Sequence, residues 1–160
     1  MQETDYNEIS EILENRLYLT NYGAVILDSD KVVNLKIDII VSILDTKPFS
    51  EELPLGYENI ELVHYDADDQ EDVDLTNFFF DFCNLMENNP GKKVLVHCFQ
   101  GVSRSSSLII AYFLMLTENL ELYPLEYFIS EVKIKRNFIK PNKSFLKQLE
   151  NFRLHLINKN

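Results

Sequence analysis

His97 and Cys98 open a short segment whose residue types suit phosphate chemistry, HCFQGVSRS at residues 97–105. The apolar residues 93–96 before it predict a short buried strand, and residues 106–116 after it have the length and composition of a helix. The segment is therefore expected at a helix N-terminus, where unpaired backbone N–H groups and the helix dipole attract an anion. The same surroundings favour the thiolate form of a cysteine, so Cys98 is a candidate nucleophile.

The residues that follow Cys98 complete a site for a phosphoryl group. Arg104 can fold back across the loop, where its planar guanidinium makes paired contacts with two phosphoryl oxygens, a geometry that lysine cannot reproduce. Gly101 lets the backbone turn close to a ligand, and the Ser105 hydroxyl is placed to stabilise the sulfur as a leaving group. His97 is expected to orient the loop through hydrogen bonds rather than to act as a base. A buried, inert thiol is the alternative interpretation of Cys98, and the agreement of the neighbouring positions disfavours it.

The pattern His-Cys-x5-Arg-Ser resembles the signature of the cysteine-dependent protein tyrosine phosphatase superfamily. The Gly-Val-Ser triplet at residues 101–103 resembles the dual-specificity branch of that superfamily. The similarity covers nearly the whole chain and is closest in pattern to the catalytic domain of the MAP kinase phosphatases. It includes residues 9–20 with Ala24, the predicted strand at residues 39–44, and the tail VKIKRNFIKPNKSFLKQL at residues 132–149.

The resemblance implies roles for further residues around the loop. Asn142 braces the loop by hydrogen bonds in the family, although a helix N-cap is an equally good interpretation of this residue. Gln100 stands where the family usually has alanine, and because that position normally contributes its backbone, the difference bears on substrate preference rather than on activity. The phosphoryl-binding positions implied by the family are Phe99, Gln100, Gly101, Val102, Ser103 and Arg104.

Hydrolysis also needs an acid that protonates the departing oxygen, and DADDQEDVD at residues 66–74 offers several carboxylates. Most of them are expected to form a solvated loop and a helix N-cap. In the family the acid precedes by six positions the leucine that begins the next helix, and Leu75 is that leucine here. The resemblance therefore selects Asp69 as the general acid, with Asp68 as the alternative.

The implied reaction has two displacements at phosphorus. The Cys98 thiolate attacks while protonated Asp69 donates to the departing phenol or alcohol, and water activated by the same carboxylate then hydrolyses the phosphocysteine. This chemistry needs no metal and no other cofactor. The three histidines are scattered at positions 64, 97 and 155, which is not the spacing of a zinc or two-metal site.

The pattern of elements predicts a single α/β domain over residues 1–160, with a central mixed, mostly parallel sheet of about five strands and helices on both faces. The phosphate-binding loop lies between a strand and a helix of this domain. At 160 residues and 46% apolar composition, the chain is long enough for one core and short for two domains. Strands are predicted near residues 11–13, 17–20, 39–44, 60–65 and 93–96, and helices near residue 23, at 73–87 and in three segments after the loop, of which the last is 143–156.

The formal net charge of −11 disfavours nucleic acid and anionic membranes as partners. It therefore weakens the alternatives of an RNA or phosphoinositide phosphatase, and the loop at residues 99–103 lacks the lysines that are usual in phosphoinositide-directed relatives. A local basic cluster could steer an anionic phosphopeptide toward the site or could merely solvate a helix end. Its members are Lys133, Lys135, Arg136 and Lys140.

We expect a phosphoprotein substrate, with phosphotyrosine and phosphoserine or phosphothreonine as reacting groups and MAP kinases as the class that the resemblance implies. A pseudophosphatase that binds phosphoprotein without turnover is the alternative from another class, and the presence of Cys98 disfavours it. The N-terminus lacks the character of a signal peptide, and the apolar run 108–116 is too short to span a bilayer. A cytoplasmic protein, with nuclear residence as a second option, is therefore expected. Cys83 is interpreted as a packed thiol, with a resolving role for oxidised Cys98 as the alternative.

Overall fold

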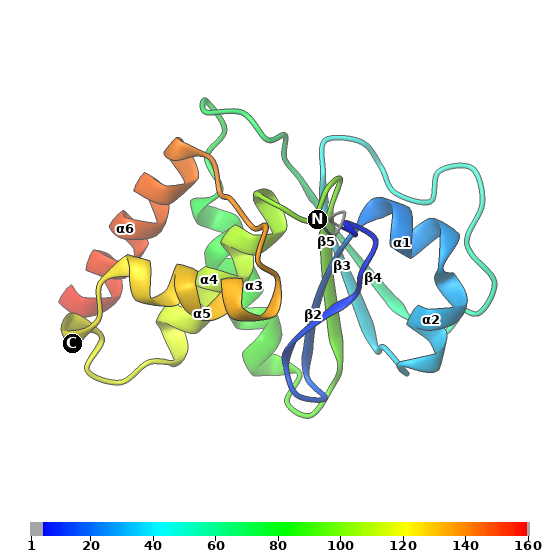
Figure 1. Ribbon diagram of the computed structural model, residues 1–160, viewed down its shortest axis with the longest axis horizontal. Coiled ribbons are helices and arrows are strands. Elements are labelled where there is room, and N and C mark those ends of the chain that lie inside the picture. The colour runs from blue at the N-terminus through cyan, green and yellow to red at the C-terminus, as the bar shows by residue number, and fades with distance from the viewer. Residues whose placement is uncertain (1–4, 160) are drawn as a thin grey trace.

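The computed structural model describes residues 5–159, in which five strands form one sheet (Figure 1). The strand order is β1-β2-β5-β3-β4, and only β1 pairs antiparallel to its neighbour, so the mixed, mostly parallel sheet is confirmed. The strands are β1 (Ser10–Leu13), β2 (Leu17–Asn21), β3 (Ile39–Leu44), β4 (Glu61–Asp66) and β5 (Val94–Cys98).

The central strand β5 carries Cys98 to the carboxyl edge of the sheet. Its residues are buried along its whole length, because both of its faces are covered. Asn21 of β2 is the register partner of Cys98, and Ser42 of β3 is paired with His97. Because parallel strands end at the same edge, the ends of β2 and β3 flank the cysteine on either side.

Helices lie on both faces of the sheet, as the sequence predicts (Figure 1). Two short helices, α1 (Tyr22–Leu27) and α2 (Ser29–Asn34), cover one face. The opposite face carries α3 (Thr76–Asn88), α4 (Arg104–Leu116), α5 (Leu125–Lys135) and α6 (Lys143–Asn158), with a 3-10 turn, η1 (Leu120–Leu122), between α4 and α5.

The strands divide their side chains between two apolar clusters, as period-2 alternation requires. Leu95 points into the smaller cluster beside α1 and α2, whereas Val94, Val96 and Cys98 belong to the larger cluster under α3 to α6. The apolar helix α4 is buried over most of its length, because α3, α5 and α6 all pack against it. The N-terminus of α4 is consequently held in place directly after the loop that contains Cys98.

The prediction from sequence differs from the structure at α2, at the start of α3, which is Thr76 rather than Val73, and at the start of α4. The short helix α2 is missing from the predicted elements, because it buries only Val32 and so has little apolar periodicity. Helix α4 begins at Arg104 rather than at Ser106. Its polar first turn can be buried because the hydroxyls of Ser106 and Ser107 donate hydrogen bonds to the Ser103 carbonyl.

Cys83 lies in α3 with only 3% of its surface exposed. Burial raises the pKa of its thiol to about 12, which suits a packed and unreactive side chain. Within residues 5–159, no helix combines the length and apolar character that crossing a membrane requires.

Candidate active site

The loop between β5 and α4 turns sharply at Gly101, which has a φ of +71°. A Cβ at this position would lie 2.6 Å from the carbonyl oxygen of Thr20 and 2.6 Å from a guanidinium nitrogen of Arg136. Glycine is therefore required both by the backbone conformation and by the space behind the loop.

The sulfur of Cys98 lies inside this loop with 2% of the residue exposed. The backbone N–H of Gly101 points at Sγ from 3.2 Å, and the Ser105 hydroxyl oxygen lies 3.0 Å from it. Hydrogen bonds to the charged form of a group favour that form, and α4 adds the positive end of its dipole at the same place. The surroundings of Cys98 thus suit a thiolate.

Arg104 is the first residue of α4, directly after the loop, with 6% of its surface exposed. One terminal nitrogen donates to the Ala67 carbonyl at 2.9 Å and lies 3.5 Å from a carboxylate oxygen of Asp45. Asp45 is half exposed, so this long ion pair contributes little. The Nε of Arg104 is buried and has no hydrogen-bond partner among residues 5–159. Since an unsatisfied buried donor is costly, this nitrogen is suited to an anionic ligand in the loop.

His97 is fully buried behind the cysteine and bonded on both ring nitrogens. Its Nδ1 lies 3.1 Å from the Cys98 carbonyl oxygen, which can only accept, and its Nε2 lies 2.6 Å from the Ser42 hydroxyl. This pattern assigns the proton to Nδ1 and makes Nε2 the acceptor. Burial lowers the pKa of His97 to about 4, so the ring is neutral near pH 7. The geometry agrees with the predicted role of orienting the loop.

The segment before α6 holds the second half of the loop. The backbone N–H of Lys140 donates to the Val102 carbonyl at 2.8 Å, and the backbone N–H of Asn142 donates to the Ser103 hydroxyl at 3.0 Å. Lys140, a member of the basic cluster, therefore contacts the loop through its backbone.

Asn142 contacts the phosphate loop through its backbone N–H, whereas its side chain makes its hydrogen bonds outside the loop. Its Oδ1 accepts from the Phe145 N–H at 2.9 Å and so caps α6, which was the alternative interpretation. Its Nδ2 donates to a carboxylate oxygen of Asp69 at 3.0 Å. Because the Asn142 backbone is bonded to Ser103, this one residue connects Asp69 to the phosphate loop.

The acidic loop between β4 and α3 is held at its start and near its middle. The Ala67 carbonyl accepts from Arg104, and Asn142 contacts the exposed carboxylate of Asp69. Asp68 instead accepts a hydrogen bond from the Asp69 backbone N–H at 2.7 Å. Leu75, from which Asp69 is counted, is the N-cap residue of α3. The structure therefore links Asp69 to the phosphate loop through Asn142, whereas Asp68 shapes the turn.

Gln148 of α6 was not recognised from the sequence as part of this arrangement. Its side-chain amide donates to the Val73 carbonyl at 2.8 Å and accepts from the Leu75 N–H at 2.7 Å. The available signal was helical spacing, since Gln148 lies one turn after the buried Phe145 and so near the face that α6 turns toward the core.

Arg136 differs most from the expectation. It is 1% exposed, so it neither solvates a helix end nor steers a substrate. Its Nε donates to the Gly101 carbonyl at 2.9 Å, and its terminal nitrogens donate to the carbonyls of Glu8 at 2.7 Å and Tyr6 at 2.8 Å. The signals in the sequence were an arginine among lysines and its place in the tail pattern at residues 132–149, and neither indicates burial. Arg136 ties the back of the phosphate loop to the segment before β1.

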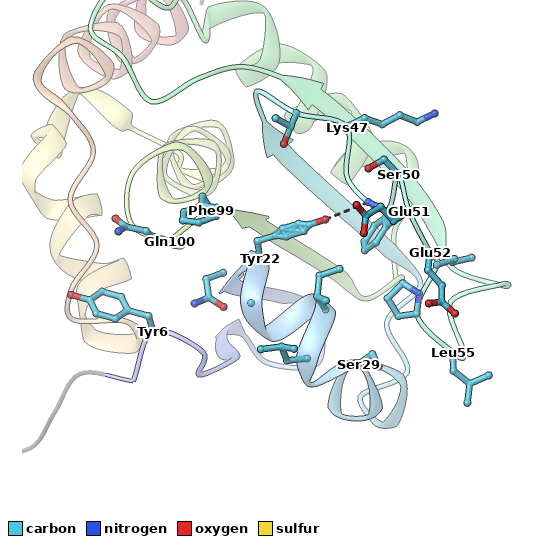
Figure 2. A pocket seen from close by; sticks show the side chains of 18 residues that line it. Tyr6, Tyr22, Ser29, Lys47, Ser50, Glu51, Glu52, Leu55, Phe99 and Gln100 are labelled. Atoms are coloured by element: carbon cyan, nitrogen blue, oxygen red, sulfur yellow. Dashed lines mark hydrogen bonds between the residues drawn. The ribbon is translucent and has the colours of Figure 1, made fainter.

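Phe99 and Gln100 are exposed at the outer rim of the loop, and their side chains border a cavity of about 1090 Å³. Figure 2 shows Tyr22 in the middle of this cavity, with Phe99 on one side and Glu51 on the other. The side chains of these two loop residues therefore face this cavity and lie outside the phosphate loop.

The sequence matches a family model described as "Dual specificity phosphatase, catalytic domain" over residues 17–154. The human protein named dual specificity protein phosphatase 13B is 33% identical over 154 residues, which cover 93% of this chain and 74% of that protein. Every candidate residue from Asp69 to Asn142 lies inside the region that the family model covers.

Two solved structures share the fold along nearly their whole length. The Yvh1 phosphatase domain from Chaetomium thermophilum matches with a TM-score of 0.80 and 23% identity, over 96% of this chain and 99% of that chain. The crystal structure of DUSP15 matches with a TM-score of 0.75 and 25% identity, over 96% of this chain and 97% of that chain. These likenesses agree with the single α/β domain described above.

Proposed function

The chain belongs to the dual specificity phosphatase family, a family of hydrolases, and on this premise we propose that it dephosphorylates tyrosine and serine or threonine in proteins through a phosphocysteine intermediate. The proposal is carried by the combination of two buried groups. The Sγ of Cys98 accepts a hydrogen bond from the Gly101 N–H, and the Nε–H of Arg104 has no hydrogen-bond partner within residues 5–159. Together they suit a nucleophile and an electrophilic phosphoryl group held side by side.

In the first step, the Cys98 thiolate forms a bond to phosphorus and the bond from phosphorus to the substrate oxygen breaks. The proton of the Asp69 carboxylic acid passes to that departing oxygen. Arg104 and the backbone N–H groups of the loop stabilise the charge that builds on the phosphoryl oxygens. The hydrogen bond from Asn142 supports this step by holding Asp69 near the loop.

In the second step, water attacks phosphorus while the Asp69 carboxylate accepts its proton. The bond between sulfur and phosphorus breaks, and inorganic phosphate and the Cys98 thiolate are released. The Ser105 hydroxyl, 3.0 Å from Sγ, can donate to the sulfur as its negative charge returns. No metal is needed for either displacement.

We propose a protein as the substrate class and a MAP kinase as the finer assignment within that class. The net charge of −11 favours protein over nucleic acid or phosphoinositide surfaces. The finer part rests on the likeness of the tail pattern to MAP kinase phosphatases and is open to direct test.

The decisive experiment measures phosphate release by the wild type and by Cys98→Ser. The substrates are phosphotyrosine and phosphothreonine peptides, a doubly phosphorylated kinase activation-loop peptide, a phosphoinositide vesicle and triphosphorylated RNA. We expect turnover of the peptides by the wild type, and binding without turnover by Cys98→Ser, because a serine hydroxyl is scarcely ionised near pH 7. Turnover by Cys98→Ser, or a preference for lipid or RNA, would contradict the proposal.

A further inference from the structure

The cavity beside the phosphate loop is larger than one phosphorylated side chain requires. It holds about 1090 Å³ between α1, the segment after β3 and the rim of the loop. Its near end is formed by Phe99 and Gln100, which directly follow Cys98 in the chain. Its far end is formed by residues 50–55, and Figure 2 shows Glu51, Glu52 and Leu55 on the side of Tyr22 that is away from Phe99. The cavity is thus a groove that continues outward from the candidate nucleophile.

Large apolar side chains are unusually exposed around this groove. Leu55 is 88% exposed, Leu27 is 75% exposed and Phe99 is 66% exposed, and all three border the same cavity. Single exposed apolar residues are ordinary, but several around one hollow next to a reactive loop mark a binding surface. Ile26 and Leu53 add partly exposed apolar surface to the same walls.

The charges along the groove favour some occupants over others. Glu51 and Glu52 line it, and Lys47 is the only basic residue among its lining residues in the part of the chain that the structure describes. An acidic segment would therefore meet net repulsion there, whereas an apolar segment would gain from contact with the leucines and Phe99.

We propose that this groove binds the stretch of substrate polypeptide that flanks the phosphorylated residue, and that it selects apolar over acidic side chains in that stretch. The inference rests on the proposed function, because a phosphoryl group at Cys98 fixes where the substrate chain enters. From there an extended chain advances roughly 3.3–3.6 Å per residue, so the next few residues pass over Phe99 and Tyr22 toward Leu55.

The test compares the wild type with the double variant Leu27→Ser and Leu55→Ser. Leu122→Ser is the matched control, because Leu122 is 71% exposed but lies in η1, which packs against α6 and does not border the groove. The substrates are para-nitrophenyl phosphate and phosphotyrosine peptides with leucine and phenylalanine, alanine or glutamate on either side of the phosphorylated residue. Specificity is measured as kcat/KM.

We expect the wild type to prefer the apolar peptide over the glutamate peptide by about tenfold or more, as contacts in an apolar pocket allow. The double variant should lose most of that preference and keep its activity on para-nitrophenyl phosphate, and the Leu122→Ser protein should behave like the wild type. A preference that survives in the double variant, or one that is lost equally in Leu122→Ser, would overturn the inference.

Failure of the proposed function through absence of phosphatase chemistry at Cys98 would look different. The wild type would then leave para-nitrophenyl phosphate intact, and the groove can still be tested by calorimetric binding of the same peptides to Cys98→Ser protein with and without the two leucine substitutions. Tighter binding of the apolar peptide that depends on Leu27 and Leu55 supports the groove, and equal binding of all peptides rejects it.

Discussion

Two buried arginines border the phosphate loop and use their donors differently. We call the side that contacts Ala67 the front of the loop and the side that contacts Tyr6 and Glu8 its back. Arg104, at the front, bonds to the Ala67 carbonyl and keeps its Nε free of partners within residues 5–159. Arg136, at the back, donates to the Gly101, Glu8 and Tyr6 carbonyls. A buried arginine can bind a ligand only where the fold leaves some of its N–H donors unpaired. Arg104 is therefore suited to bind a phosphoryl group, and Arg136 is suited to hold the loop in place.

Electrostatics adds to the difference between the two sides. Burial lowers the pKa of Arg136 to about 10, and the charge of nearby Cys98 opposes that decrease. Arg136 therefore remains charged near pH 7 and adds positive potential behind the sulfur without touching it. Substitutions at the front should change the reaction, and substitutions at the back should change mainly stability.

The largest effect is expected at the front, from Asp69→Asn. A general acid matters most for a basic leaving group, so kcat/KM should fall by roughly 10²–10⁴ for phosphotyrosine or an alkyl phosphate and much less for an aryl phosphate with an acidic phenol. The measurement is a plot of rate against leaving-group pKa. Asp68→Asn is the matched control and should be mild throughout. If Asp69→Asn lowered kcat/KM equally for both kinds of substrate, Asp69 would position the loop rather than donate a proton.

Arg104→Lys should come next, with a loss of kcat/KM on the order of 10²–10³, because a point charge cannot replace the fork that holds two phosphoryl oxygens. Its urea unfolding midpoint should stay near that of the wild type. Steady-state kinetics and denaturant titration check the two halves of this expectation. A loss below about fivefold would move Arg104 out of the candidate site.

Arg136→Lys should give the reverse result. It leaves buried carbonyls without donors, so the free energy of unfolding should fall by about 2–4 kcal/mol. The activity of the folded fraction should fall less than in Arg104→Lys. Equilibrium unfolding and active-site titration together report both quantities. If Arg136→Lys kept the stability of the wild type and lost activity a hundredfold, the two arginines would not differ in role as proposed.

The smallest effect concerns pH and His97. Its pKa is about 4 when folded, from desolvation, against 6.5 for an ordinary histidine, so the unfolded chain binds the proton first. Stability should therefore decrease as the pH falls from 6.5 toward 4, by at most about 3 kcal/mol from this residue. Unfolding titrations across this range should show a shallower decrease for His97→Asn. Identical slopes for both proteins would exclude His97 as a contributor.

The sequence predicted the front of the loop far better than its back. The strand at Ile39–Leu44 was predicted with its observed bounds, because a parallel strand covered on both faces is apolar along nearly its whole length, here at every position except Ser42. Cys98 and Arg104 were found because their spacing is local. Arg136 could not be assigned in this way, since its partners Tyr6 and Glu8 are more than a hundred residues away and nothing beside it in the chain indicates burial.

The acidic loop at residues 66–74 also makes contacts that local sequence could not predict, although their partners are nearer in the chain than those of Arg136. Counting from Leu75 selected Asp69, and the structure places that carboxylate against Asn142. The contacts of Gln148 with Val73 and Leu75 depend on how α6 lies against α3, which local sequence does not specify. For Asn142, the local role of capping α6 was predictable, whereas its contact with Asp69 was not.

The bond between Arg136 and the Tyr6 carbonyl joins residues 130 positions apart, which has a consequence for folding. Contacts of such long sequence separation close large loops and tend to form late. A chain still attached to the ribosome, with residue 136 inside the exit tunnel, would already display Cys98 and Arg104 but would lack the support behind Gly101. We expect such a nascent chain to be inactive, so the onset of turnover would report the completion of folding.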